Sequence, residues 1–204
     1  MKRKIKYIFI LIFLLFCFIF ISLSSYASTI SKNLSDNFFR LHILANSNSE
    51  IDQNLKLKVR DSIIKYMDTQ NFSEHTKDDV VHSVQNNLDI YKQISENTIK
   101  ECGFDYSVSV EVNNFYFPTK EYGNISLPAG YYDALRIKIG EAKGENWWCS
   151  LFPPLCFVDV SSGIIDESAT ENLKENLSEE EFAIITNDNE TIKLKFKIIE
   201  LFSN

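Results

Sequence analysis

Two cysteines and two tryptophans lie within the segment GENWWCSLFPPLCFVD, residues 144–159, together with an adjacent pair of prolines. Cys149 and Cys156 are separated by six residues, a spacing that permits a disulfide bond on the oxidising side of a membrane. The bridge would close a loop of eight residues and stabilise the fold by about 2.5 kcal/mol in the chain-entropy model. We predict this bond, with Cys102 left unpaired. The alternative is two buried free thiols that pack as small apolar groups.

The histidines and short motifs offer little catalytic chemistry. No pair of the three histidines has metal-ligand spacing, and the sequence contains no GxSxG, no HExxH and no glycine-rich phosphate loop. The best catalytic cluster available is Arg40 and His42 with a carboxylate brought near by folding, as a cell-envelope hydrolase would need. A strand with a solvated polar face explains the same pair, because no nucleophile accompanies them. We therefore predict no enzyme activity, no cofactor, no metal site and no small-molecule substrate.

The adjacent tryptophans are the second feature of the cysteine segment. On an extended chain, Trp147 and Trp148 point to opposite sides. One of them can then lie in the core while the other is exposed and anchors a partner, since tryptophan is common at the centre of interfaces. The other arrangement packs both side chains across the cysteine bridge, because large aromatic residues dominate cores.

The first residues indicate that the chain is exported. A positive cluster precedes an unbroken apolar or aromatic run over residues 7–21, and small residues follow it up to Ala27. The cluster consists of Lys2, Arg3, Lys4 and Lys6. This is the layout of a secretory signal, so we predict a signal peptide over residues 1–27 with cleavage between Ala27 and Ser28. As a helix the run spans ~22 Å, short of the roughly 30 Å hydrocarbon core, although residues 7–23 could form an uncleaved N-terminal anchor.

Export changes the charge balance of the remaining chain. Four of the 21 basic residues and none of the 28 acidic residues lie within residues 1–27, so the exported part has a net charge of −11. A surface this acidic repels nucleic acid and anionic lipid heads. We therefore expect no nucleic-acid partner, and contact with the membrane only through the N-terminal segment. We predict a linker over residues 28–36 and a single domain over residues 37–204, which is long enough to build its own core.

Hydrophobic periodicity indicates one strand and two helices in the first half of this domain. Residues 37–46 alternate as a strand, and the turn-rich NSNSE that follows can cap a helix. A stripe of apolar residues with a spacing of four then predicts a helix that ends near Asp68. The stripe consists of Ile51, Leu55, Val59, Ile63 and Met67. Thr76 with Asp79 predicts the start of a second, longer helix that Gly103 stops.

Short strands dominate the second half. Residues 105–112 alternate, and prolines and glycines divide residues 115–144 into short strands, of which residues 132–140 are the clearest. WWCSLF and CFVDV flank the proline pair as further strands, SEEEFAI indicates a short helix or loop, and residues 191–202 alternate as a last strand. This order predicts an α+β domain, in which a mainly antiparallel sheet carries two amphipathic helices on one face.

Two blocks of the sequence resemble the stage II sporulation protein R family. The first block is RLHILANSNSEIDQNLKLKVRD, residues 40–61. The second, within residues 117–159, combines FPTKEYGN with LPAGYYDALRIKIGEAKGENWWCSLFPPLCFVD. LPAG, NWWC and LFPPLCF occur together and in this order, which makes the resemblance specific. It extends from about Phe39 to Asp159, and the N-terminal signal and the length of the chain agree with it.

The resemblance implies an intercellular signal of endospore formation. Members of this family are made in the forespore and exported across its membrane into the space between the two cells. There they activate a membrane-embedded aspartic protease, stage II sporulation protein GA, which processes the mother-cell pro-sigma factor. Such a protein acts by binding. Its alternatives are the envelope hydrolase considered above and a structural envelope protein.

The same blocks contain polar and aromatic positions that core packing does not demand. We expect the turn over residues 46–49, the LPAG turn and the exposed member of the tryptophan pair to contact the protease. The expected contact residues are Arg40, His42, Asn46, Ser47, Pro128, Gly130, Trp147 and Trp148. The predicted bridge between Cys149 and Cys156 would hold this segment rigid.

Overall fold

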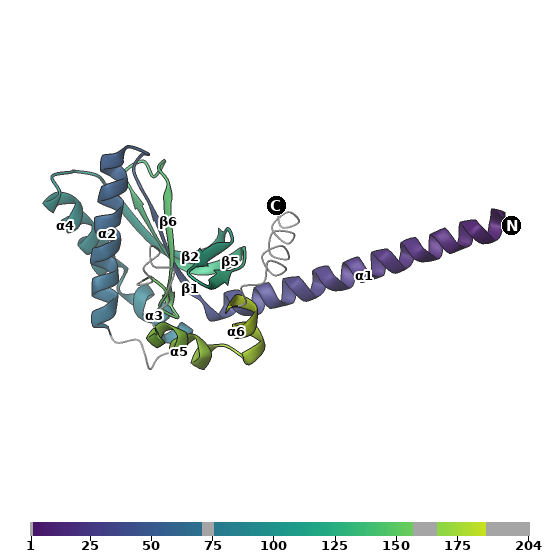
Figure 1. Cartoon of the computed structure of the whole chain (residues 1–204). Coiled ribbons are helices and arrows are strands. Elements are labelled where there is room, and N and C mark those ends of the chain that lie inside the picture. Colours follow the sequence, from purple (N-terminus) through teal and green to yellow (C-terminus); the bar gives the residue numbers. More distant parts are fainter. Residues whose placement is uncertain (1, 71–75, 157–166, 187–204) are drawn as a thin grey trace.

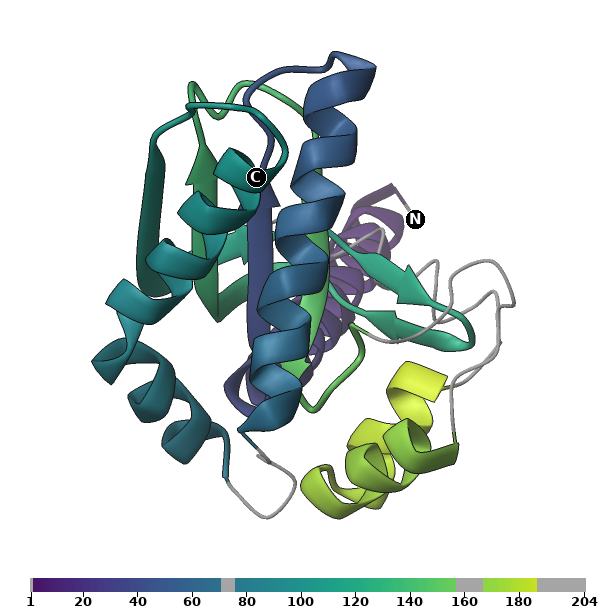
Figure 2. The ribbon, with the colours of Figure 1, turned by 90° about the vertical axis from the view of Figure 1, so that its left-hand side faces the viewer.

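The computed structural model describes residues 2–70, 76–156 and 167–186, and a four-stranded sheet forms the centre of this part of the chain (Figure 1). The sheet consists of β1 (Phe39–Leu44), β2 (Val108–Phe117), β5 (Gly130–Ile139) and β6 (Asn146–Phe152). A separate hairpin consists of β3 (Lys120–Tyr122) and β4 (Ile125–Leu127). The helices are α1 (Lys2–Asn37), α2 (Glu50–Thr69), α3 (Lys77–Asn86), α4 (Leu88–Glu101), α5 (Glu167–Asn176) and α6 (Glu179–Thr186). Figure 2 shows α2 and α4 on one side of the sheet and α1 on the other.

Strand β1 lies inside the sheet although it comes first in the chain. The order of the strands is β2-β5-β1-β6, in which β1 runs parallel to β5 and antiparallel to β6, while β2 runs antiparallel to β5. Phe39, Leu41 and Ile43 have no exposed surface, and Arg40 and His42 on the opposite face are also buried. Burial on both faces is the environment of a central strand. The predicted α+β fold with a mainly antiparallel sheet is confirmed.

Helix α2 covers the sheet with most of the predicted apolar stripe. The buried members of the stripe are Leu55, Val59, Ile63 and Met67. The side chain of Ser49 caps the helix by accepting a hydrogen bond from the backbone N–H of Asp52 at 3.2 Å. The prediction was wrong for Ile51, which is 62% exposed. Asp52 takes the buried position of this first turn instead, because it accepts hydrogen bonds from the side chains of Asn46 and Ser47.

The predicted second helix is divided into α3 and α4. Thr76 and Asp79 form the predicted capping box, and Gly103 with its φ of +83° follows the end of α4 as expected. The break lies at Asn87, which leaves the helical conformation and donates from its side chain to the carbonyl of Ser83 at 2.7 Å. Asparagine favours such local hydrogen bonds over a regular helix, and sequence periodicity does not detect them. The break gives α4 its own direction, along which it packs against α2.

The C-terminal predictions are tested only in part. The strand expected at residues 191–202 lies outside the described residues, as does most of the strand expected at residues 156–160. Helix α6 confirms the short helix in SEEEFAI, whereas α5 was not predicted. Strands β3 and β4 confirm the short strands between the glycines and prolines, and they meet at Gly123, whose φ is +57°.

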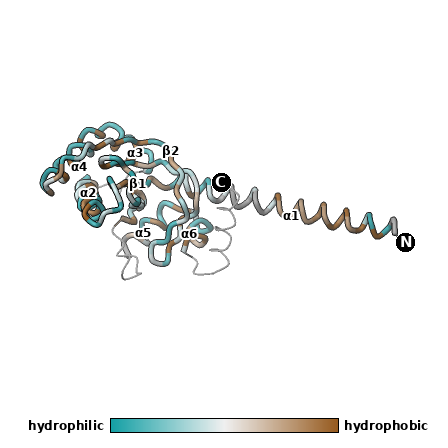
Figure 3. The backbone as a smooth tube through the Cα atoms, turned by 90° about the horizontal axis from the view of Figure 1, so that it is seen from above, coloured by the Kyte–Doolittle hydropathy of each residue, from teal (hydrophilic) through white to brown (hydrophobic). Residues whose placement is uncertain are grey.

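Helix α1 continues without a break through the segment expected to be a linker. Its apolar span, Lys4–Ser22, is the one described helical stretch that is long and apolar enough to cross a membrane, and a signal sequence passes the same test (Figure 3). The last turns pack on the domain instead of linking it. Leu34 has no exposed surface, and the Ser31 hydroxyl donates to the carbonyl of Ala129 at 3.0 Å. Ser31, Leu34 and Ser35 share one buried face of the helix, which favours a helical conformation of these residues up to the end of α1 at Asn37. Cleavage between Ala27 and Ser28 stays a prediction.

Replacement of Leu34 tests whether the end of α1 belongs to the domain. Because this side chain is fully buried, we expect Leu34→Ala to lower the free energy of unfolding of the exported chain by about 3 kcal/mol. Asn33→Ala, at the neighbouring exposed position, should change it by less than about 0.5 kcal/mol. Urea unfolding measures both. Equal stabilities of the two variants would mean that residues 28–36 do form a linker.

Candidate partner-binding face of the sheet

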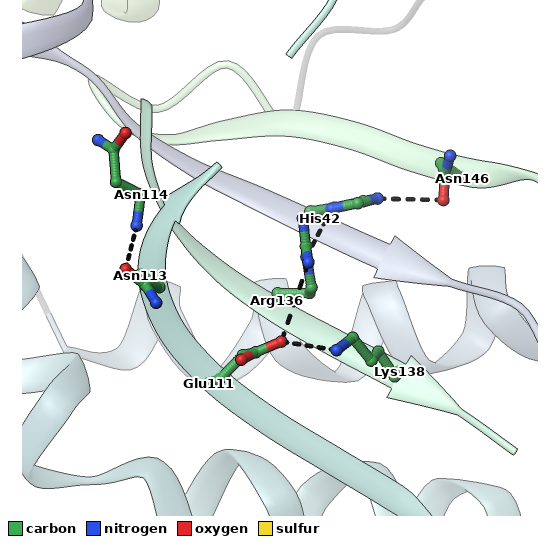
Figure 4. A network of polar contacts seen from close by, with 7 residues as sticks. All are labelled: His42, Glu111, Asn113, Asn114, Arg136, Lys138 and Asn146. Carbon is green, nitrogen blue, oxygen red and sulfur yellow. Dashed lines mark hydrogen bonds and ion pairs between the residues drawn. The ribbon is translucent and has the colours of Figure 1, made fainter. Parts of the chain in front are cut away.

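A row of side chains crosses the sheet on the face opposite α2 and α4 (Figure 4). The strand register pairs Glu111 of β2 with Arg136 of β5, and Arg136 with His42 of β1. His42 in turn lies opposite Trp148 of β6. Residues that are directly opposite on neighbouring strands point to the same face, so these side chains form a continuous row. Asn146 lies two positions from Trp148 and therefore on the same face.

His42 is held as a neutral ring by two neighbours. Its Nδ1 accepts a hydrogen bond from the Nε–H of Arg136 at 3.1 Å, so its own proton lies on Nε2, which donates to Oδ1 of Asn146 at 3.0 Å. The ring stacks on Trp148 with 3.7 Å between the centroids. Burial is the main reason why the pKa of His42 falls from 6.5 to about 4, and the positive charge of Arg136 acts in the same direction. The ring therefore stays uncharged near neutral pH.

Arg40 lies deeper on the same face and has no exposed surface. Its Nε donates to the carbonyl of Cys149 at 3.2 Å, and its Nη2 donates to the hydroxyl of Tyr122 at 2.6 Å. The guanidinium carbon also lies 4.4 Å from the ring centre of Phe117 and 4.9 Å from that of Tyr132, within the range of cation–π contacts. Arg40 thus joins the β3–β4 hairpin to the sheet. Because Arg40 is fully buried, it can hold the residues of the face in position but does not reach the surface, where we expected it to contact a partner.

The two tryptophans lie on opposite faces of β6. Trp147 faces the helices, where its ring centre lies 4.2 Å from the guanidinium carbon of Arg60 on α2. Trp148 stacks on His42 and also meets Phe117 edge to face, with 4.5 Å between the ring centres. Both tryptophans are partly exposed. Each therefore combines internal packing with some exposed surface, an outcome between the two arrangements considered from the sequence.

A disulfide bond joins Cys149 to Cys156, which confirms the predicted pairing. The two Cα atoms are 5.1 Å apart, and the backbone N–H of Leu155 donates to the carbonyl of Ser150 at 3.0 Å. Together the two interactions fold the proline-containing turn back against β6. Cys102 is a free thiol, as expected.

The turn after β1 is tied to the connection between β5 and β6. The side-chain oxygen of Asn46 accepts a hydrogen bond from the backbone N–H of Glu141 at 2.9 Å, and Gly144 donates to the carbonyl of Ala45 at 2.9 Å. A Cβ atom at Gly144 would collide with the carbonyl of Ser47. The two turns therefore form one corner, in which Asn46 and Ser47 remain partly exposed.

The LPAG turn is largely buried beneath the end of α1. Pro128 is buried, and its carbonyl accepts a hydrogen bond from the hydroxyl of Tyr132 at 2.7 Å. Gly130 is partly exposed, but a Cβ atom there would lie 3.3 Å from Oγ of Ser31 in α1, tighter than ordinary contact. The turn is thus a packing element, and of its two expected contact residues only Gly130 reaches the surface.

The two ring nitrogens of His42 are fully engaged by neighbours on the face. They contact Arg136 and Asn146, and Glu111 lies on the far side of Arg136 from His42. Within residues 2–70, 76–156 and 167–186, no group of three His, Cys, Asp or Glu residues could hold a metal ion. What the face offers is hydrogen-bond donors, charge and aromatic surface.

A known protein family shares the region that builds this face. The family model described as stage II sporulation protein R matches residues 35–162, which include the six strands that the structure describes. The chain belongs to the stage II sporulation protein R family. Stage II sporulation protein R of Bacillus subtilis (strain 168) is 42% identical over 130 residues, which cover 64% of this chain and 58% of that protein. The chain thus matches a little over half the length of this relative. No solved structure matches.

Several residues of the face were missed in the sequence analysis, although they lie in the region shared with the stage II sporulation protein R family. Arg136 and Lys138 occupy the polar positions of the clearest predicted strand, residues 132–140, and this alternation was the available signal. Glu111 and Asn146 carried no signal of their own. The four residues lie on three strands, β2, β5 and β6, and β1 separates β5 from β6. They share one face only because of this strand order, which local periodicity does not encode.

The pH dependence of stability should reveal the neutral His42. Its pKa is lower in the folded than in the unfolded state, so its contribution to stability is present above pH 6.5 and is lost as the pH falls from 6.5 toward 4. The free energy of unfolding of the wild type should fall between pH 7 and pH 4. In His42→Gln we expect this fall to be smaller by on the order of 3 kcal/mol. His82→Gln, at an exposed position of α3, should keep the wild-type pH dependence in the same denaturant titrations. The proposal of a neutral ring fails if both variants lose stability with pH as the wild type does.

The bridge should contribute measurably to the stability of the fold. Cys149→Ser combined with Cys156→Ser opens the eight-residue loop and should lower the free energy of unfolding by about 2.5 kcal/mol, because the unfolded chain gains freedom. Cys102→Ser serves as the control, since this thiol is free. Thermal unfolding under oxidising conditions compares the variants. An unchanged midpoint in the double variant would show that the turn is held without the bridge.

Proposed function

We propose that this chain is an exported signalling protein of endospore formation that acts by binding a membrane protein. It is made in the forespore, crosses the forespore membrane into the space between the two cells and activates the membrane-embedded aspartic protease, stage II sporulation protein GA. The protease then processes the mother-cell pro-sigma factor. Membership of the stage II sporulation protein R family carries this proposal, because the matched residues 35–162 include the four described strands of the sheet.

The N-terminal helix and the bridge support export. The apolar span of α1, Lys4–Ser22, is compatible with a signal sequence or an anchor, and basic residues precede or begin it. Either form would place the domain on the far side of the membrane. The Cys149–Cys156 bond also agrees with an oxidising compartment, since disulfides are rare in the cytosol.

Activation by binding requires a difference in affinity. A protein that bound the active and inactive arrangements of the protease equally would shift nothing, and a change from 1:99 to 99:1 needs about 10⁴-fold preference. A rigid surface suits this task because its side chains lose little freedom when they bind. The bridge, the Asn46 corner and the buried Arg40 all restrict the face described above.

The proposed contact surface is the accessible part of this face together with the neighbouring corner. The expected contact residues of this face and corner that keep exposed surface are Asn46, Ser47, Gly130 and Trp148. Trp147 also keeps exposed surface, but on the opposite face of the sheet beside Arg60 of α2. Arg40, His42 and Pro128 are buried, and we propose that they hold the others in position.

Co-expression in a non-sporulating bacterial host tests the proposal. The chain, the protease and the sigma-factor precursor would be produced together, and the size of the precursor followed by immunoblotting. We expect the precursor to be shortened only when the chain is exported, because the partner is engaged from outside. Removal of residues 1–27 should abolish processing, and an unrelated secretory signal in their place should restore it.

Two outcomes would contradict this function. Processing that is equally efficient when the chain stays in the cytosol would exclude a signal acting from outside. Complete absence of processing, with all three proteins folded and in their compartments, would exclude direct activation of the protease.

A further inference from the structure

One part of the sheet face presents hydrogen-bond donors to solvent. Arg136 and Lys138 of β5 keep 22% and 37% of their side-chain surface exposed, and Asn146 of β6 is exposed on the same face, across Leu44 of β1 from Lys138. His42 donates to Oδ1 of Asn146, so the amide has its N–H groups left to offer. We refer to Arg136, Lys138 and Asn146 as the donor cluster.

Arg136 is held in one orientation. Its Nε donates to Nδ1 of His42 at 3.1 Å, and its guanidinium carbon lies 3.4 Å from the ring centre of Phe115. The distance from Nη1 to the carboxylate of Glu111 is 4.0 Å, too long for a hydrogen bond. A guanidinium fixed in this way loses little freedom on binding, and its planar set of N–H groups matches the geometry of a carboxylate.

Two cations share one carboxylate at this place. Glu111 lies 2.8 Å from Nζ of Lys138 and 4.0 Å from Nη1 of Arg136. The row therefore has an excess positive charge, in an exported chain whose net charge is −11. Charges that are far apart are screened at physiological salt, so the local excess decides what binds here. It selects an acidic ligand, and Glu111 partly occupies the position of that ligand in the free protein.

Apolar surface lies next to the donor cluster. Leu44 is partly exposed between Lys138 and Asn146 in the strand register, and Trp148 is partly exposed next to His42. Arginine and tryptophan are the residue types that most often dominate the binding energy of protein interfaces. Fixed donors beside apolar surface fit a segment of protein better than a small free anion, which would leave the apolar part unused.

We propose that the donor cluster binds an acidic segment of the protein partner, whose Asp or Glu carboxylate is held between Arg136 and Lys138. This carboxylate takes the position that Glu111 partly fills in the free protein, and the apolar side chains of the segment lie on Leu44 and Trp148. The inference rests on the proposed function and deepens it, because it specifies the chemistry of the segment that the protease presents.

The double variant Arg136→Gln with Lys138→Gln tests this in the full exported chain. Binding would be measured by co-purification with the protease in detergent at two salt concentrations, together with processing of the precursor. We expect about tenfold weaker binding and a smaller effect of salt, because the two charges that salt screens are gone. Lys65→Gln with Lys100→Gln makes the same change in net charge at exposed positions of α2 and α4 and should bind as the wild type does.

Glu111→Gln separates binding from a structural role of the same network. If the donor cluster receives a carboxylate from the partner, removal of the internal competitor should strengthen binding by about twofold or more. If the network only stabilises the sheet, the same change should weaken binding or leave it unaltered. That second result overturns the proposal, and so does wild-type binding by the Arg136→Gln, Lys138→Gln variant.

A titration without the protease keeps this inference separable from the proposed function. A blocked Gly-Glu-Asp-Tyr-Gly peptide and its Gln, Asn counterpart would be added to the ¹⁵N-labelled chain in detergent micelles, and the Arg136 Nε–H signal followed by NMR. We expect a shift with the acidic peptide only. Such a shift without processing in cells would leave this inference standing and remove the proposed function. Normal processing without a shift would remove this inference alone, and so would sedimentation showing that the face pairs with a second copy of the chain.

Discussion

Strand β1 pairs with β5 on one side and with β6 on the other, so the connection from β5 to β6 has to cross the end of β1. The crossing is possible because Gly144 has no Cβ to collide with the turn after β1, and because Gly140 adopts a φ of +56°. Asn46 then bridges the corner by accepting a hydrogen bond from Glu141. This arrangement places residues 40–61 beside residues 117–156, which make up the described part of the two blocks that resemble the stage II sporulation protein R family.

The position of β1 between β5 and β6 also gives one face of the sheet two different ends. At one end the β3–β4 hairpin covers Arg40, whose burial would be costly if its N–H groups lacked partners. The carbonyl of Cys149 and the hydroxyl of Tyr122 accept hydrogen bonds from Nε and Nη2, and the rings of Phe117 and Tyr132 lie against the guanidinium, whereas Nη1 has no hydrogen-bond partner among the described residues. At the other end Arg136 stays in contact with water. His42 lies between the two ends, and its lowered pKa lets a polar ring pack inside the sheet without a buried charge.

The helix that carries the apolar span also belongs to the packed domain. Ser31 and Leu34 join the end of α1 to β5 and the LPAG turn, so the sheet follows the apolar span without a flexible segment among the described residues. If α1 remains in the membrane, the face is held close to its surface. If cleavage occurs after Ala27, residues 28–37 stay with the domain as a short docked helix.

Much of this protein was determined by interactions between residues that are close in sequence. Composition and spacing predicted the apolar N-terminal span, most of the α2 stripe and the capping box of α3, because each depends on residues close in sequence. The short spacing of Cys149 and Cys156, taken together with an oxidising compartment, predicted the bridge. A structural change that depends on one residue was not predicted: the sequence indicated one long second helix, and Asn87 divides it into α3 and α4. Arg40 and Arg136 mark the limit of such reasoning. Both occupy polar positions of alternating strands, yet one is fully buried and the other partly exposed. Only the tertiary structure decided this difference, because it depends on where the hairpin folds and on the pairing of His42 with Arg136, 94 residues away in the sequence.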